Sequence, residues 1–287
     1  MNSMKVLVTG AKGQLGSDLM AALHAAKIPA LGIDREDVDL TDHTAVSTVM
    51  HREHPTHVIH CAAYTAVDQA QREPELCYRI NVTATGNLAA LCRELNAVMV
   101  YISTDYVFDG SGDRPWEVED QPNPQTVYGQ TKLAGELALK AQLSTYFIVR
   151  IAWAFGIHGK NFINTMLRLA QTQSEIRVVN DQFGSPTSTA DLSQLLIRMI
   201  QTDRYGTYHA TNEGFCSWAE FAQAIFKTAG LSMRVIPIPS EDYPTPAKRP
   251  KNSRLSKASI EGFGRLPTWQ DALDRYLHAL TKNTSST

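Results

Sequence analysis

The sequence has few cysteines, little net charge and no long apolar run, and each of these absences excludes a class of protein. Its four cysteines form no C-x-x-C pair, so we expect reduced, mostly buried thiols. The formal net charge of −2 over 287 residues provides no basic field to attract nucleic acid or an anionic membrane. No stretch approaches the roughly 18 apolar residues of a membrane span, and the first residues lack the pattern of a signal peptide. We therefore expect a cytoplasmic globular protein that binds neither nucleic acid nor a membrane.

The N-terminal segment combines a short strand, a glycine-rich turn and a helix. Residues 5–9 form a β-branched run, and apolar residues recur at helical spacing from Leu15 to Ala26. Between them, Gly10, Gly13 and Gly16 have the spacing G-x-x-G-x-x-G rather than G-x-G-x-x-G. Such glycines let the backbone approach a pyrophosphate, and a helix N-terminus offers free N–H groups. This pattern predicts the phosphate-binding start of a dinucleotide fold, with an ordinary strand-to-helix turn as the alternative.

Two adjacent charged residues bear on which dinucleotide is bound. Asp34 and Arg35 end the second expected strand, about twenty residues after the glycines. An acid at this place holds a ribose hydroxyl of NAD, whereas an arginine pairs with the extra phosphate of NADP. Solvated loop charges are the alternative for both residues. The sequence therefore predicts NADPH or NADH as cofactor without choosing between them.

Three residues in the middle of the chain predict proton-transfer chemistry. If Tyr128 and Lys132 share a helix, they lie one turn apart on one face. A neighbouring ammonium favours the phenolate, so we expect Lys132 to lower the pKa of Tyr128. Thr104 follows an expected strand over residues 98–102, where its hydroxyl would face a substrate oxygen. Together with a hydride carrier, these groups suit a carbonyl/alcohol pair.

The order of the expected elements predicts an α/β fold. Strands expected at 5–9, 30–33, 57–60, 98–102 and 146–151 alternate with helices, which is typical of a Rossmann-type, doubly wound parallel sheet. We expect residues 1–155 to form an NAD(P)-binding domain. Residues 156–287 would form a smaller α/β substrate-binding lobe, with some segments returning to the first domain. Residues 109–127 form a long loop rich in glycine, proline and charge, and such loops are often functional or act as lids.

Several strings extend this pattern to a family. They are GQLG at 13–16, STDYVF at 103–108, YGQTK at 128–132, DQFGSPT at 181–187 and RPKNS at 249–253. With them the chain resembles the extended short-chain dehydrogenase/reductases, and in particular the dTDP-4-dehydrorhamnose reductases, over nearly its whole length. That family reduces the C4 ketone of dTDP-4-dehydro-6-deoxy-L-mannose to dTDP-L-rhamnose with NAD(P)H. The resemblance implies the same oxidoreductase activity, in dTDP-rhamnose and polysaccharide biosynthesis.

The resemblance also implies a role for individual residues. Tyr128 would donate the proton to the sugar O4, Lys132 would lower its pKa and hold the nicotinamide ribose, and Thr104 would bind the reacting oxygen. The other implied substrate-binding residues are Asp105, Tyr106, Trp153 and Arg249, the last facing the diphosphate. The other implied cofactor-binding residues are Gly10, Gly13, Gln14, Leu15, Gly16, Asp39, Leu40, Ala62, Ala63 and Tyr64. The alternatives for Trp153 and Arg249 are a core aromatic and a surface charge.

The sequence departs from the family at a metal site and leaves two other functions open. Some members dimerise through carboxylate-bound magnesium, but here Asp18 is accompanied by Ala190, so we assign no metal ligand and leave a homodimer open. One alternative is a related nucleotide-sugar 4-ketoreductase, epimerase or dehydratase. The other is a non-catalytic, NADP-binding regulatory subunit, against which the intact Thr104, Tyr128 and Lys132 argue.

Overall fold

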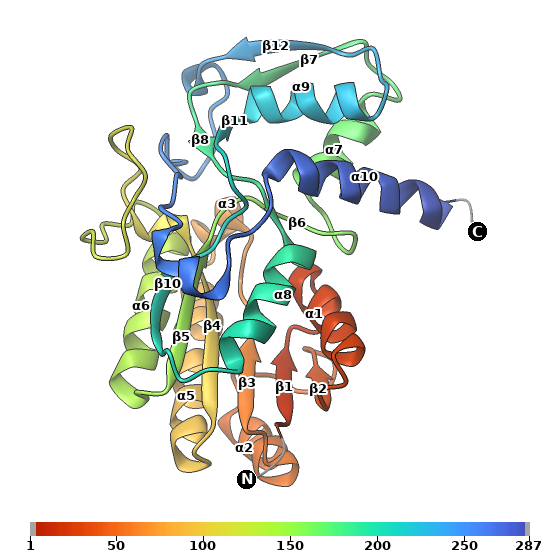
Figure 1. The fold of residues 1–287 in the computed structure, drawn as a ribbon. Helices are drawn as coiled ribbons and strands as arrows, with labels where there is room; N and C mark the ends of the chain where they lie inside the picture. The colour runs from red at the N-terminus through yellow and green to blue at the C-terminus, as the bar shows by residue number, and fades with distance from the viewer. Residues whose placement is uncertain (1–3, 285–287) are drawn as a thin grey trace.

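A six-stranded parallel sheet forms the centre of the computed structural model, which describes residues 4–284 (Figure 1). In spatial order its strands are β10 (Gly206–His209), β5 (Tyr146–Ile151), β4 (Val98–Thr104), β3 (His57–His60), β1 (Val6–Thr9) and β2 (Ala30–Ile33). All five neighbouring pairs are parallel. The strand order reverses between β1 and β3, and open α/β sheets bind ligands at such a point, outside the carboxyl ends of the strands. The predicted Rossmann-type fold is confirmed.

Helices cover both faces of this sheet (Figure 1). One face packs against α1 (Gln14–Ala25) and α8 (Thr189–Ile200), and the other against α2 (His43–Glu53), α5 (Ala84–Glu94) and α6 (Val127–Gln142). Because side chains alternate along a strand, Val6 and Val8 enter the first apolar cluster and Leu7 enters the second. Both clusters are buried, so the strands are apolar on both sides, as parallel strands usually are.

The segment before α5 is less regular than its sequence pattern. It contains α3 (Val67–Ala70) and α4 (Pro74–Tyr78), followed by a π-helical turn at Arg79–Thr83 that continues into α5. Pro74 opens α4, as expected for its first turn. Single π turns inside helices occur often at functional sites, and this one places Asn81 beside the site described below.

The second half of the chain builds a smaller lobe above the sheet (Figure 1). Its helices and strands are β6 (Ala154–Phe155), α7 (Phe162–Leu169), β7 (Glu175–Val179), β8 (Phe183–Gly184), β9 (Thr187–Ser188), β11 (Cys216–Ser217), α9 (Trp218–Thr228), β12 (Arg234–Ile238) and α10 (Trp269–Thr284). Short 3-10 turns lie at Asp105–Val107, Ser240–Asp242 and Ala258–Phe263. An aromatic-rich cluster with Phe155 and Phe221 at its centre holds the lobe together. Within this half, α8 and β10 lie on the large sheet rather than in the lobe.

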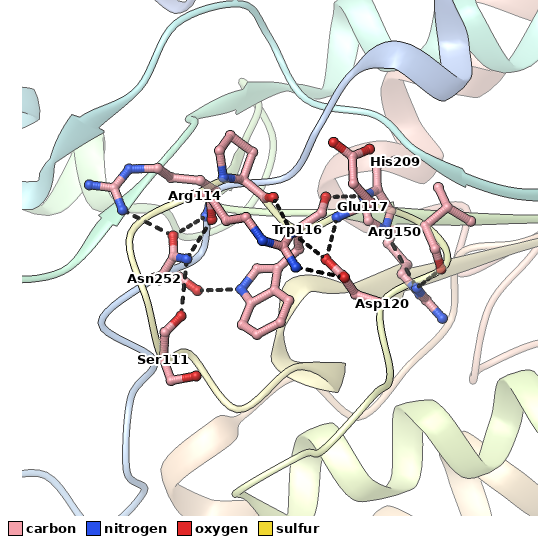
Figure 2. A network of polar contacts seen from close by, with 11 residues as sticks. Ser111, Arg114, Trp116, Glu117, Asp120, Arg150, His209 and Asn252 are labelled. Carbon is pink, nitrogen blue, oxygen red and sulfur yellow. Dashed lines mark hydrogen bonds and ion pairs between the residues drawn. The ribbon is translucent and has the colours of Figure 1, made fainter.

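The long loop over residues 109–126 is fixed to the rest of the molecule and has no features of a mobile lid. Trp116 stacks on Phe108 with ring centroids 4.7 Å apart, and its indole N–H donates to Asn252 O at 3.1 Å. Figure 2 shows this network, in which Arg114 also forms an ion pair with Asp120 at 2.7 Å. The loop therefore packs against and hydrogen-bonds the C-terminal segment around Asn252 rather than closing over a ligand.

Candidate active site

A cleft of about 1220 Å³ opens at the carboxyl ends of β1, β3 and β4. Its walls come from both halves of the chain. The predicted site residues that line it are Gly10, Gly13, Gln14, Leu15, Asp34, Arg35, Asp39, Leu40, Ala62, Ala63, Tyr64, Thr104, Asp105, Tyr106, Tyr128, Lys132, Trp153 and Arg249. The structure therefore brings these residues together, and Gly16 is the one predicted member that does not line the cleft.

The glycines of the first turn leave no room for a side chain. Gly10 has φ +65°, and a Cβ there would lie 2.7 Å from Ala62 N. A Cβ on Gly16 would lie 2.1 Å from Gly10 O, so a glycine at this position lets α1 pack closely against the turn. Gly13 is the N-cap of α1 and provides no side-chain cap, which leaves the first N–H groups of the helix free for an anion. The turn therefore fits a dinucleotide pyrophosphate.

The loop after β2 forms the far end of the cleft. Asp34 accepts two backbone N–H groups, from Lys12 at 2.9 Å and from Arg35 at 2.8 Å. Asp39 accepts both the N–H and the hydroxyl of Thr41, and these hydrogen bonds hold the pKa of Asp39 below its ordinary value. The carboxylates thus shape the loop, and the exposed guanidinium of Arg35 lies beside them at the edge of the cleft.

Tyr128 and Lys132 share helix α6, which begins at the Thr126 N-cap, and Thr104 is the last residue of β4. Thr104 and Lys132 are 5% and 2% exposed. Burial raises the pKa of Tyr128, and the neighbouring Thr104 side chain opposes this rise. The three predicted catalytic residues therefore lie at one place in the cleft.

The expected effect of Lys132 on Tyr128 is not found. Burial raises the pKa of Tyr128 above its ordinary value, and the nearby Asp105 raises it further. Burial also lowers the pKa of Lys132 to about 7, against the raising influence of Glu136 one turn away. The Lys132 Nζ lies 3.9 Å from the centre of the Tyr101 ring. Among the protein's own groups, the predicted lowering of the Tyr128 pKa by Lys132 was wrong. Burial disfavours both the phenolate of Tyr128 and the ammonium of Lys132.

Asp105 has an unusual environment next to Thr104. It is 3% exposed, and its Oδ1 accepts the Thr104 hydroxyl at 3.0 Å. Its Oδ2 is buried without a hydrogen-bond partner, and burial raises the pKa of Asp105 to about 6. Buried polar atoms are almost always paired, so an orphaned carboxylate oxygen in a cleft marks a place for a ligand hydroxyl.

Aromatic and cationic side chains form the cleft wall beside Tyr128. Tyr106 meets Tyr128 edge to face with centroids 5.5 Å apart, and its hydroxyl accepts a hydrogen bond from Arg249 at 3.4 Å. Arg249 also pairs with Asp68 at 2.6 Å. The Arg249 guanidinium therefore already has two partners within the protein, which the sequence did not indicate.

Trp153 stands in a strained conformation at the other wall. Its φ of +51° is uncommon for a bulky residue and is a conformation that functional sites often maintain. Its indole stacks on Trp218 with centroids 3.7 Å apart. The cleft also includes Trp218, which the sequence analysis missed because 65 residues separate the two tryptophans. Asn81 was missed too, although it bonds to the backbone of Tyr64 at 2.8 Å and fixes the cofactor side of the cleft.

Comparisons with known proteins agree with this geometry. Residues 4–282 match the family model described as RmlD substrate binding domain. The dTDP-4-dehydrorhamnose reductase of Escherichia coli is 37% identical, covering 98% of this chain and 100% of the relative. A crystal structure of the dTDP-4-dehydrorhamnose reductase of Clostridium acetobutylicum has a TM-score of 0.94 and 42% identity, covering 97% of this chain and 100% of that chain. The Bacillus anthracis enzyme in complex with NADP has a TM-score of 0.94 and 40% identity, covering 96% of this chain and 99% of that chain. The chain therefore belongs to the RmlD substrate binding domain family, among the dTDP-4-dehydrorhamnose reductases.

Proposed function

We propose that this protein reduces the C4 ketone of dTDP-4-dehydrorhamnose to dTDP-L-rhamnose with NADPH. The observation that carries the proposal is the convergence of Thr104, Tyr128 and Lys132 in a cleft that also contains a glycine turn free of side chains. The relatives named dTDP-4-dehydrorhamnose reductase and the NADP-bound structure support it. Arg35, exposed beside Asp34, favours NADPH over NADH because a guanidinium suits a phosphate.

The residues divide the chemistry between them. Bound NADPH supplies the hydride. Thr104 holds the ketone oxygen, and Tyr128 donates its proton to that oxygen as negative charge develops there. Lys132 binds the nicotinamide ribose through its ammonium form, which its pKa of about 7 retains at and below neutral pH.

The remaining residues bind the two ligands. The unpartnered Oδ2 of Asp105 accepts a sugar hydroxyl, Tyr106 and Trp153 cover the ring, and Arg249 meets the diphosphate. The cofactor contacts are those of Gly10, Gly13, Leu15, Asp34, Asp39, Leu40, Ala62, Ala63 and Tyr64. We further propose that residues 1–155 form the NAD(P)-binding domain and also supply Asp105, Tyr106 and Trp153 to the sugar pocket, while the lobe from residue 156 on adds Arg249 and Trp218.

Turnover distinguishes this function from its alternatives. Incubation with the dTDP-4-keto sugar should consume NADPH stoichiometrically, followed at its absorbance, and NMR of the product ring should show the C4 configuration of rhamnose. An epimerase or dehydratase would keep its cofactor through turnover. No NADPH or NADH oxidation by the protein alone would favour a regulatory subunit.

Replacing Tyr128 tests the proton donor. Tyr128→Phe should lower kcat about 10²- to 10⁴-fold, the usual contribution of a positioned acid, and leave NADPH affinity unchanged. Tyr243→Phe is the matched control, because that phenol is 61% exposed and lies outside the cleft lining. Equal activity of the two variants would refute the assigned role.

No helix among residues 4–284 combines the length and apolarity that a bilayer span requires. Our proposal places the protein in the cytoplasm, supported by four free cysteines.

A further inference from the structure

The side chain of Gln14 turns away from the predicted phosphate site and binds a loop of the second half. Its Oε1 accepts the N–H of Gly156 at 3.0 Å, and its Nε2 donates to Lys160 O at 3.1 Å. Both hydrogen bonds join residues more than 140 positions apart. Gln14 therefore fastens the loop over residues 156–161 to the N-terminus of α1.

Further hydrogen bonds hold the loop over residues 156–161 in this position. Asn161 donates to Gly156 O at 2.8 Å and to the Tyr276 hydroxyl at 3.1 Å, which closes the loop and ties it to α10. Gly159 has φ +79°, and a Cβ there would lie 3.0 Å from Cγ of Gln14. A side chain at Gly159 would thus push the loop away from the turn, so the close approach depends on this glycine.

The loop brings Lys160 to the cleft wall, next to Gly13 and Gln14. Two of the other lining cations have their charges engaged in ion pairs. Lys12 pairs with Glu36 and Arg249 with Asp68.

Lys132, a further lining cation, is buried beside Tyr101. Over residues 4–284, Lys160 and Arg35 are the exposed cations of the cleft wall that take part in no ion pair. Lys160 belongs to the loop that Gln14 binds, and Arg35 belongs to the loop after β2.

We propose that Lys160 is a cofactor-binding residue that meets the dinucleotide pyrophosphate, and that Gln14 positions it through the loop over residues 156–161. The inference rests on the proposed NADPH site. It adds a cation from the second half of the chain to the free N–H groups of α1, whose dipole favours the same anion. Cofactor binding then depends on the seating of the second half against the first.

Cofactor titrations of the full chain test the proposal without turnover. Lys160→Met should weaken NADPH and NADH about three- to fivefold each at low salt, measured by nucleotide fluorescence, because both contain the pyrophosphate. The loss should shrink as ionic strength rises. ADP should show the same loss, and adenosine should show none. Arg35→Met, in contrast, should weaken NADPH and leave NADH unchanged.

Two further variants separate position from folding. Lys227→Met removes an exposed lysine from the last turn of α9, outside the cleft lining, and should bind both nucleotides normally. Gln14→Leu should weaken NADPH as Lys160→Met does, and the double variant should be no weaker than the weaker single one. Lys160→Met remains decisive should Gln14→Leu fail to fold.

Unchanged NADPH affinity in Lys160→Met would overturn the proposal, as would a loss confined to NADPH, which would place Lys160 at the 2′-phosphate instead. If the protein binds NADPH with the expected Lys160 dependence but does not turn over the keto sugar, the proposed function fails and this inference stands.

Discussion

The ion pair between Glu136 and Arg150 is the buried contact whose loss we expect to cost most stability. Glu136 accepts from Arg150 Nη2 at 2.8 Å and from Nε at 2.9 Å, and the two side chains are 1% and 3% exposed. The Ser103 hydroxyl donates to the same carboxylate at 2.5 Å. Arg150 also takes part in the polar network of the 109–126 loop (Figure 2), and its Nη1 donates to Val118 O at 3.4 Å. The pair thus joins α6, β4, β5 and the loop.

Glu136→Gln keeps the shape of the side chain and removes its charge. The guanidinium of Arg150 then stays buried without a counter-charge, which costs about 3–5 kcal/mol. For a chain of this length the entropy of unfolding is about 0.6 kcal/mol per kelvin, so the melting temperature should fall by about 5–8 °C. Because Glu136 raises the pKa of Lys132, the variant should also have a more acidic Lys132 and lower activity at and just below neutral pH, where the wild type still has the ammonium form.

Calorimetry of wild type and variant at pH 7 measures the shift. Asp242→Asn is the matched control, because its ion pair with Arg177 at 3.1 Å is more than half exposed and should contribute less than about 1 kcal/mol. Glu136→Gln combined with Arg150→Met should recover part of the loss, since no unpaired charge remains. A fall of less than about 2 °C in Glu136→Gln, equal to that of the control, would refute the reasoning.

Two further predictions concern the pH dependence of stability and the cleft wall that contains Trp153. Burial lowers the pKa of Lys132 from 10.5 to about 7. Between pH 7 and pH 10.5 the unfolded chain therefore binds a proton at Lys132 that the folded chain lacks, so this residue makes the stability of the fold rise with pH. In urea denaturation the stability of wild type relative to Lys132→Met should increase by about 2 kcal/mol from pH 7.5 to 9.5; a constant difference would contradict the lowered pKa. Gly184→Ala would place a Cβ 2.7 Å from Cε2 of Trp153 and displace the indole. It should lower kcat/KM for the nucleotide sugar about 10- to 100-fold while NADPH titrations stay unchanged; normal kinetics would show that Trp153 does not contact the sugar.

Local patterns predicted much of the fold from sequence. The strands at residues 30–33, 57–60 and 146–151 have the expected bounds, since each is a short apolar run with clear flanking residues. Asp42 caps α2, and Ser217 with Glu220 forms a capping box at the start of α9, a pattern that is visible in the sequence as S-x-x-E. These features depend on residues that are close together in the sequence, so they can be recognised without knowing how the chain folds.

What the sequence did not predict depends on contacts across the chain. The stacking of Trp153 on Trp218 and the direction of the Gln14 side chain are set by packing between the two halves. Gly16 does not line the cleft although it shares the spacing pattern of Gly10 and Gly13, because such a pattern does not show which glycine packs against backbone. The pKa of Tyr128 was misjudged for a related reason: a spacing of four residues places Lys132 nearby but says nothing of burial.

The return of β10 and α8 to the large sheet has a consequence for how this architecture can evolve. In a chain ending at residue 155, β5 would be an unpaired edge strand. The apolar surface of the sheet that Leu192, Leu195 and Leu196 cover would also be exposed. The second half of the chain is therefore not a separate unit that could be exchanged, because a transplanted half would bring with it part of the large sheet and of its apolar cluster.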